Sequence, residues 1–244
     1  GNINLVTSAG IIPVGSPTSP GPGQFTNFST MAVDSAYLII THKALWTEAN
    51  NYKLYRASTT GGGYNVVMAD VEELYDQFIY GCGKNPLGIR RYADYLIHNW
   101  SPHPQPKTLL ILGKAFHASD SRGNMDCGCN WSIVRDLDYV PSFGNPASDI
   151  LFTAGLGGIA PDAPAFATGR IAARAPHHIA DYLNKVDLFE HTPPDDWKKQ
   201  VLHFGGGDDA AQQAVFRNYL ENYGWIIKQR RFGGNVTHFY KTAS

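Results

Sequence analysis

The sequence predicts an α/β protein with a mainly parallel sheet and helices on both faces. Two observations support this class. Short continuous apolar runs, which are typical of buried central strands, alternate along the chain with segments whose apolar residues recur at helical spacing. Strands that alternate with helices are joined by right-handed crossovers, which make neighbouring strands parallel. We therefore expect a three-layer, flavodoxin-like sheet.

Composition narrows the functional classes. The 244 residues are 43% hydrophobic and 17% charged, as in globular proteins. Twenty basic and 21 acidic side chains give a formal net charge of -1, so no overall field attracts nucleic acid or anionic lipid. Nucleic-acid binding is therefore disfavoured. No apolar run approaches the roughly 20 residues that a membrane-spanning helix requires.

The chain divides into three expected regions. Residues 1–35 are rich in Gly, Pro, Ser and Thr. Proline removes backbone donors and glycine adds chain entropy, so this region is predicted to be an extended lead-in or linker. Residues 36–138 are predicted to form a first α/β subdomain, and residues 139–244 the start of a second one.

The first subdomain contains three strands and three helices in alternation. The expected strands cover residues 37–40, 65–69 and 108–112, and the expected helices cover residues 45–57, 71–79 and 86–100. In the first helix we expect Ala49, Tyr52 and Leu54 to face inward. The second helix should begin at Asp70 as N-cap, with Glu73 completing a capping box.

The second subdomain continues this alternation. A strand closes at residues 169–171, and a helix ends at Glu190. Residues 201–204 and 225–227 are expected to be strands on either side of a helix at 210–223. The last of these strands has no following helix to cover it, so we expect the subdomain to be truncated.

Four motifs carry a resemblance to a known family. They are the extended VPSFG…SD segment at 140–149, the strand end Gly169-Arg170-Ile171, the helix end NKVDLFE at 184–190, and the acidic start Asp195-Asp196-Trp197. Together they resemble the gingipain-type cysteine peptidases, caspase-like enzymes that include the type IX secretion sortase. The resemblance runs from Ala36 to Tyr223.

The resemblance implies a caspase-like fold, peptide-bond hydrolysis of a polypeptide substrate, and a secreted or outer-membrane, cell-surface location. The family uses a His-Cys dyad in which the histidine precedes a glycine after an aliphatic strand, and the cysteine follows the next strand. None of the nine histidines here precedes a glycine. We therefore expect no catalytic residue in this chain, and a dyad beyond residue 244. No cofactor is implied, although the sequence leaves room for calcium.

Ligands of open parallel sheets lie beyond the carboxyl ends of the strands. Here those ends lead into three loops, at residues 41–43, 114–138 and 205–209. In the third loop, Asp208 and Asp209 are expected to cap the following helix. The alternatives are calcium binding or support of a downstream catalytic histidine, since their closest counterpart in the family is the acidic pair of sortase-like members.

The second loop holds Cys127 and Cys129 close to His117 and Asp126. Thiolate and imidazole are zinc ligands, but the Cys-x-Cys spacing is less usual than Cys-x-x-Cys and a fourth ligand is not obvious, so free thiols are favoured over a metal site or a disulfide. Asp149 is a further metal candidate. Arg170 is expected to form a structural ion pair with Asp149 or Glu190.

Two other functions remain open. Family members commonly have Gly-Asp after the third strand, where this chain has Gly113-Lys114. That exchange favours a non-catalytic surface or secretion module that has kept the peptidase scaffold. The second alternative is an unrelated flavodoxin-like domain that binds a nucleotide or flavin with the three loops.

Overall fold

The structure is a computed structural model that describes residues 25–31, 36–81, 83–99, 108–117, 131–144 and 146–242. The chain forms two compact units, Gly1–Asp187 and Leu188–Ser244. The boundary expected at residues 138 and 139 lies inside the first unit, where the segments on both sides of it contribute strands to one sheet.

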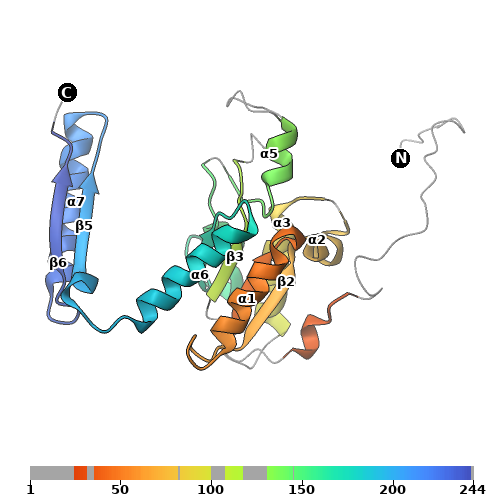
Figure 1. Cartoon of the computed structure of the whole chain (residues 1–244). Helices are drawn as coiled ribbons and strands as arrows, with labels where there is room; N and C mark the ends of the chain where they lie inside the picture. Colours follow the sequence, from red (N-terminus) through yellow and green to blue (C-terminus); the bar gives the residue numbers. More distant parts are fainter. Residues whose placement is uncertain are drawn as a thin grey trace, which may run out of the picture. The chain divides into compact units, whose positions relative to one another are not determined.

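The first unit contains a four-stranded, fully parallel sheet (Figure 1). Its strands are β1 (Tyr37–Thr41), β2 (Val66–Asp70), β3 (Thr108–Leu112) and β4 (Ala167–Ile171), in the order β2-β1-β3-β4. The chain thus adds strands first on one side of β1 and then on the other. The carboxyl ends of β1 and β3 lie at this reversal, which is where open α/β sheets bind ligands.

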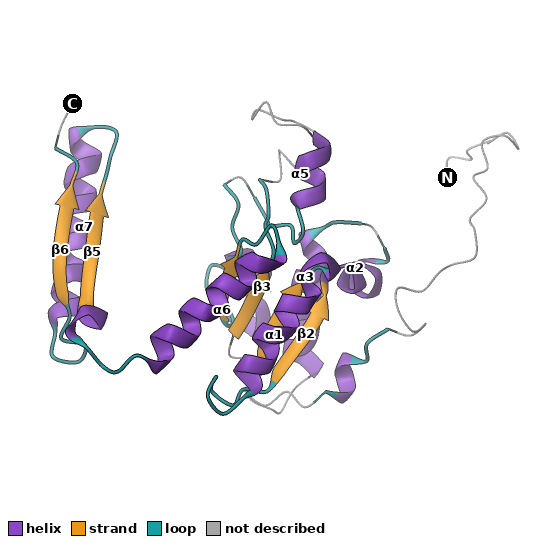
Figure 2. Cartoon of the chain, viewed as in Figure 1, coloured by secondary structure: helices purple, strands orange, loops and turns teal. Residues whose placement is uncertain are grey.

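Helices cover both faces of this sheet (Figure 2), which confirms the predicted α/β class. Side chains alternate across the strands: Leu38 and Ile40 pack against α2 (Val71–Ile79) and α3 (Pro86–Asn99). Ile39 faces the other side, where α1 (Trp46–Ala57) and α6 (Pro176–His191) pack. The inward position predicted for Leu54 is wrong, because this side chain is exposed.

The end of the expected lead-in is part of the first core. Phe28, in the short helix η2 (Phe28–Thr30), is buried, and its ring centroid lies 4.7 Å from that of Tyr92. Thr26 donates to the Glu73 carboxylate through its backbone N–H and its hydroxyl. Glu73 therefore does not complete the predicted capping box, whereas Asp70 caps α2 as expected.

Several short helices were not predicted. The helix α5 (Trp131–Leu137) falls within the loop predicted at 114–138. The remaining ones are η3 (Lys43–Leu45), η4 (Ile150–Phe152), η5 (Leu156–Gly158) and η6 (Asp196–Lys199).

The second unit is a parallel pair, β5 (Gln200–Gly205) and β6 (Asn235–Tyr240), with α7 (Ala210–Lys228) on one face. The strand predicted at residues 225–227 is wrong, because these residues form the last turn of α7. Gly224 is buried in that helix, and a Cβ there would lie 3.0 Å from the His238 ring. The apolar run at 225–227 thus belongs to a helix packed closely on β6, not to a third strand.

Candidate functional site

Two of the three predicted loops meet at the carboxyl edge of the four-stranded sheet. His42 and Lys43 follow β1, while Gly113 and Lys114 follow β3, the adjacent strand. The third loop, at 205–209, follows β5 in the other unit and belongs to another sheet. The structure therefore gathers one polar cluster from β1, β2 and β3 at this edge, and a separate acidic turn in the second unit.

His42 is held in one orientation by three neighbours. The backbone N–H of Ala44 donates to His42 Nδ1 at 3.1 Å, so the neutral ring carries its proton on Nε2. That nitrogen lies 3.4 Å from a carboxylate oxygen of Glu72, and the ring stacks on Tyr139 with centroids 5.0 Å apart. Lys43 Nζ lies 2.6 Å from the other Glu72 oxygen. The carboxylate therefore bridges an imidazole and an ammonium group.

The pKa shifts follow from these contacts. Burial opposes ionisation of Glu72, but the hydrogen bond from Lys43 and the nearby His42 and Lys43 outweigh it, so the pKa of Glu72 is lowered. The same hydrogen bond raises the pKa of Lys43. Burial raises the pKa of Asp70, whose carboxylate caps α2. The cluster thus favours a charged Glu72–Lys43 pair at neutral pH.

Arg170 forms the second polar group at this edge. Its guanidinium donates to both carboxylate oxygens of Asp149, from Nε at 2.7 Å and from Nη2 at 2.8 Å. Its Nη1 donates to the carbonyls of Gly113 at 2.6 Å and Val140 at 2.8 Å. One side chain on β4 therefore joins the end of β3 to the segment at 139–149. Of the two carboxylates considered for this ion pair, Asp149 pairs with Arg170. Glu190 belongs to the other unit.

Asp149 is fully occupied by this arrangement. It also accepts from the Ser142 hydroxyl at 2.8 Å. Burial opposes its ionisation, but the hydrogen bonds and charge of Arg170, together with Ser142, lower the pKa of Asp149. A carboxylate already neutralised by a bidentate guanidinium is a poor cation ligand, which argues against the metal role considered for Asp149.

Gly113 allows the end of β3 to lie close to the segment at 139–149. Its φ of +151° lies in the region that favours glycine, and a Cβ there would lie 2.9 Å from Val140 Cγ2. The next residue is Lys114, the position at which the sequence departs from the Gly-Asp pattern. Its Nζ lies 4.6 Å from the centroid of the Phe116 ring, a cation–π contact.

In the second unit, the acidic turn has the geometry of a helix cap. The Asp209 carboxylate accepts from the Gln212 backbone N–H at 2.8 Å, and the Gln212 side chain accepts from the Asp208 backbone N–H at 3.1 Å. Asp209 is thus the N-cap of α7, in agreement with the capping interpretation. Among the described residues, no group of three or more His, Cys, Asp or Glu side chains could hold a metal ion.

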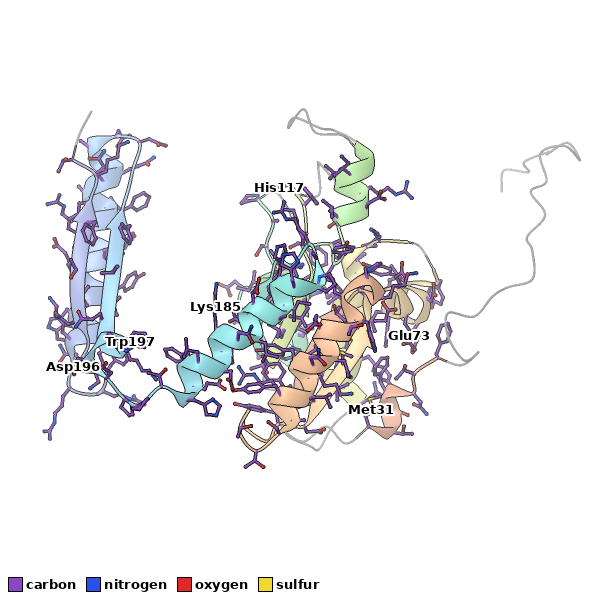
Figure 3. The ribbon with its side chains drawn as sticks, in the orientation of Figure 1. Met31, Glu73, His117, Lys185, Asp196 and Trp197 are labelled. Carbon is purple, nitrogen blue, oxygen red and sulfur yellow. The ribbon has the colours of Figure 1, made fainter. Side chains whose placement is uncertain are left out.

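Most of the cysteine-containing candidate site lies outside the described residues, because Asp126, Cys127 and Cys129 fall in a gap of the structure. The third cysteine, Cys82, also lies outside them. His117 is described and is exposed (Figure 3). The described part of the carboxyl edge therefore provides oriented and paired charges, but its residues include no thiol.

The sequence and the fold are similar to those of known proteins. The model of peptidase family C25 matches residues 32–243. The chain belongs to peptidase family C25. This is the gingipain family indicated by the sequence motifs, so that prediction is confirmed. No curated protein sequence matches the chain.

One similar solved structure is that of dimeric latent PorU from Porphyromonas gingivalis, at 17% identity and a TM-score of 0.49. The similarity covers 77% of this C25 chain but only 21% of the PorU chain. This C25 chain therefore corresponds to about a fifth of the length of that protein.

Sequence reasoning gave Asp149 as one of two candidate partners of Arg170 in this C25 chain, but missed Glu72 as the partner of His42 and Lys43. A signal was available: Thr41 pairs with Asp70 in the parallel register, so the first turn of α2 must lie beside the residues that follow β1. The contribution of Ser142 has no comparable signal, because it depends on how the segment at 139–149 folds back.

Proposed function

We propose that this chain is part of the peptidase domain of a gingipain-like cysteine peptidase, and that it supports a Cys-His dyad supplied from outside these residues. The family match over residues 32–243 carries this proposal. The sequence adds that no histidine precedes a glycine, as the catalytic histidine of the family does. The substrate is proposed to be a polypeptide. The cysteine thiolate would attack the carbonyl carbon of the peptide bond, and the histidine would protonate the amine that leaves.

The second unit presents a surface suited to the remaining part of such a domain. The face of the β5–β6 pair opposite α7 carries Leu202, Phe204 and Phe239, which are 57%, 71% and 49% exposed. Two-stranded sheets are marginal alone, and parallel sheets are usually covered on both faces. An exposed apolar face on a parallel pair therefore favours further protein packed against it.

The helix α7 extends this apolar surface. Its outward side chains form a stripe at helical spacing, and each is 42–54% exposed: Val215, Phe216, Tyr219 and Tyr223. An open surface pocket of about 400 Å³ is lined by Phe204 and Gly206 at the end of β5 and by Phe216 and Tyr223 of α7. We propose that the remaining part of the peptidase domain covers this stripe and fills this pocket.

Peptide hydrolysis tests the proposal. The chain of 244 residues should not cleave peptide bonds, whereas the longer parent protein should do so in a thiol-dependent manner. Replacing Cys82, Cys127 and Cys129 together with serine should leave hydrolysis by the parent unchanged. Thiol-dependent cleavage by the 244-residue chain, abolished by one of these three substitutions, would overturn the proposal.

A matched pair of variants tests the covering surface. Phe204→Ser should change the unfolding midpoint of the 244-residue chain little, because the side chain is 71% exposed, but it should destabilise the parent. Leu54→Ser, which alters an exposed apolar residue of the first unit, is the control and should be tolerated in both proteins. If Phe204→Ser is equally mild in both proteins, the remaining part of the domain does not cover this face.

The proposed location is secreted or associated with the outer membrane and cell surface, with export by type IX secretion. It rests on membership of the gingipain family. In the described part of the chain, no helix is both long and apolar enough to cross a membrane. Fractionation of the native bacterium should recover the parent protein outside the cytoplasm, and recovery from the cytoplasm alone would contradict this assignment.

A non-catalytic module is the second candidate function. It is favoured by Lys114, which presents an ammonium group where the family commonly has a carboxylate, and which contacts the Phe116 ring. The parent sequence distinguishes the two functions. An aliphatic strand ending in His-Gly, followed by a strand ending in Cys, supports the enzyme, whereas absence of both supports the module.

A further inference from the structure

The turn between α7 and β6 gathers three cations and two exposed aromatic rings. Lys228 ends α7, and Arg230 and Arg231 follow on the turn. Trp225 and Phe232, which flank these cations, are 67% and 49% exposed. We call these five residues the basic turn. The whole chain has a formal net charge of -1, whereas the basic turn carries three positive charges and no negative one.

Backbone hydrogen bonds fix the shape of this turn. The Gln229 N–H donates to the Ile226 carbonyl at 3.1 Å, and the Gly233 N–H donates to the Gln229 carbonyl at 2.7 Å. The Gly234 N–H then donates to the Ile227 carbonyl at 3.0 Å. The chain reverses within a few residues, so the cations project from one closed turn and not from an extended segment.

The cations of the basic turn lack acidic partners. Within the part of the chain that the structure describes, Lys228, Arg230 and Arg231 make no ion pair, and all three are exposed. Asp208 and Asp209 lie at the opposite end of α7, about 27 Å away along a 19-residue helix. Asp195 and Asp196 lie four and three residues before Lys199, but among the described residues no ion pair joins them to the turn. The three cations therefore outnumber the nearby acids, and the turn keeps a net positive charge.

Helix stability explains only part of this pattern. A cation in the last turn of α7 interacts favourably with the negative end of the helix dipole, and Lys228 occupies that position. Arg230 and Arg231 lie beyond the helix, so the dipole does not account for them. Nor does it account for two large aromatic side chains beside them in water.

We propose that the basic turn binds the surface of an anionic phospholipid membrane. Guanidinium groups of Arg230 and Arg231 match phosphate oxygens in a bidentate manner, and clusters of basic residues are attracted to anionic headgroups. Trp225 and Phe232 supply rings of the kind that lie at the membrane–water interface. The exposed aliphatic side chain of Ile226 beside them fits lipid better than a phosphodiester chain.

The position of the turn agrees with this role. The turn precedes β6, and Lys199 precedes β5, whose first residue pairs with the first residue of β6 in parallel register. Lys199 Nζ is the nearest atom, at 3.9 Å, to a Cβ placed on Gly233. This lysine adds a cation beside the turn. The turn thus lies at the starting end of both strands, and membrane contact there leaves the carboxyl ends of β5 and β6 free.

Vesicle co-sedimentation of the full 244-residue chain tests the proposal. The probe is phosphatidylcholine vesicles containing phosphatidylglycerol, compared with vesicles of phosphatidylcholine alone. The double variant Arg230→Gln, Arg231→Gln should bind the anionic vesicles about 25-fold more weakly, at about fivefold per cation. Binding by the unaltered chain should also fall with added salt, because screening weakens attraction between exposed charges.

The control variant carries Arg174→Gln and Lys185→Gln, which remove the same charge from exposed positions of the first unit; Lys185 is labelled in Figure 3. It should bind like the unaltered chain. Trp225→Ala should weaken binding without changing its salt dependence.

Equal loss in the control and in the double variant would overturn the proposal, as would equal binding to both vesicle types. Competition by a DNA duplex that does not depend on Trp225 would instead assign the turn to nucleic acid. Circular dichroism of each variant confirms that α7 is retained.

Discussion

Replacing Arg170 with methionine removes the side chain that joins β4 to two other segments. Asp149 would keep only the hydroxyl of Ser142 as a partner, and the carbonyls of Gly113 and Val140 would lose their charged donor. The side chains of Arg170 and Asp149 are only 12% and 22% exposed. Breaking a buried ion pair costs about 3–5 kcal/mol, and partial solvent access to Asp149 places this case near 3 kcal/mol.

Hydrogen exchange measures this loss within the first unit alone. The amide of Gly113 donates to the Ile171 carbonyl, and the amide of Val140 donates to the Lys114 carbonyl. A loss of about 3 kcal/mol should speed exchange of these amides roughly 150-fold where they exchange by opening of the unit. Arg174→Met, at an exposed position, is the matched control and should cost less than about 0.5 kcal/mol. If the two variants exchange at similar rates, Arg170 does not hold this edge together.

The same pair predicts a dependence on pH. The pKa of Asp149 is lowered in the folded chain, so its contribution to stability is fully present above the unfolded value of about 3.9. It is lost as pH falls through the lower, folded value. Urea unfolding monitored by hydrogen exchange should therefore show a loss of stability below about pH 4 that Asp149→Asn reduces. An unchanged acid profile in Asp149→Asn would contradict the assignment.

Three further substitutions test separate features. Gly113→Ala should destabilise the first unit by about 1–3 kcal/mol, because both φ and space exclude a Cβ, whereas Gly169→Ala, with nothing within 4 Å, is the control in thermal unfolding. Asp209→Ala should lower the stability of the second unit by about 1 kcal/mol, while Asp208→Ala should cost less, and calcium should not shift either melting curve. Glu72→Gln should lower the stability of the first unit by less than about 1 kcal/mol. In the unaltered chain, the stability that Glu72 contributes should disappear as pH falls through its lowered pKa, and the variant should lack this loss when the unfolding midpoint is measured against pH.

Strand positions in the first unit could be predicted because burial on both faces leaves continuous apolar runs. The run at 108–112 is such a case, and it forms β3 as expected. The run at 225–227 has the same appearance, but its neighbours at 220 and 224 face β5 and β6 at helical spacing, which identifies it as a helix. A short apolar run does not distinguish these two outcomes by itself.

The candidate site was only partly predictable. Asp149 could be proposed for Arg170 because an arginine in a half-buried strand requires a carboxylate. The role of Glu73 was not predictable, since its partner Thr26 lies 47 residues earlier, in a segment whose composition indicated a linker. Phe28 shows why: its buried ring holds the described residues 25–31 against the core, a contact that the composition of residues 1–35 does not indicate.

Labelling of the reactive cysteine tests the central claim most directly. The active parent protein would be treated with a peptide-based thiol electrophile, and the modified residue would be located by mass spectrometry. We expect a label on a cysteine outside these 244 residues, and none on the three cysteines of this chain. Modification of Cys82, Cys127 or Cys129 that parallels loss of peptide hydrolysis would contradict this expectation.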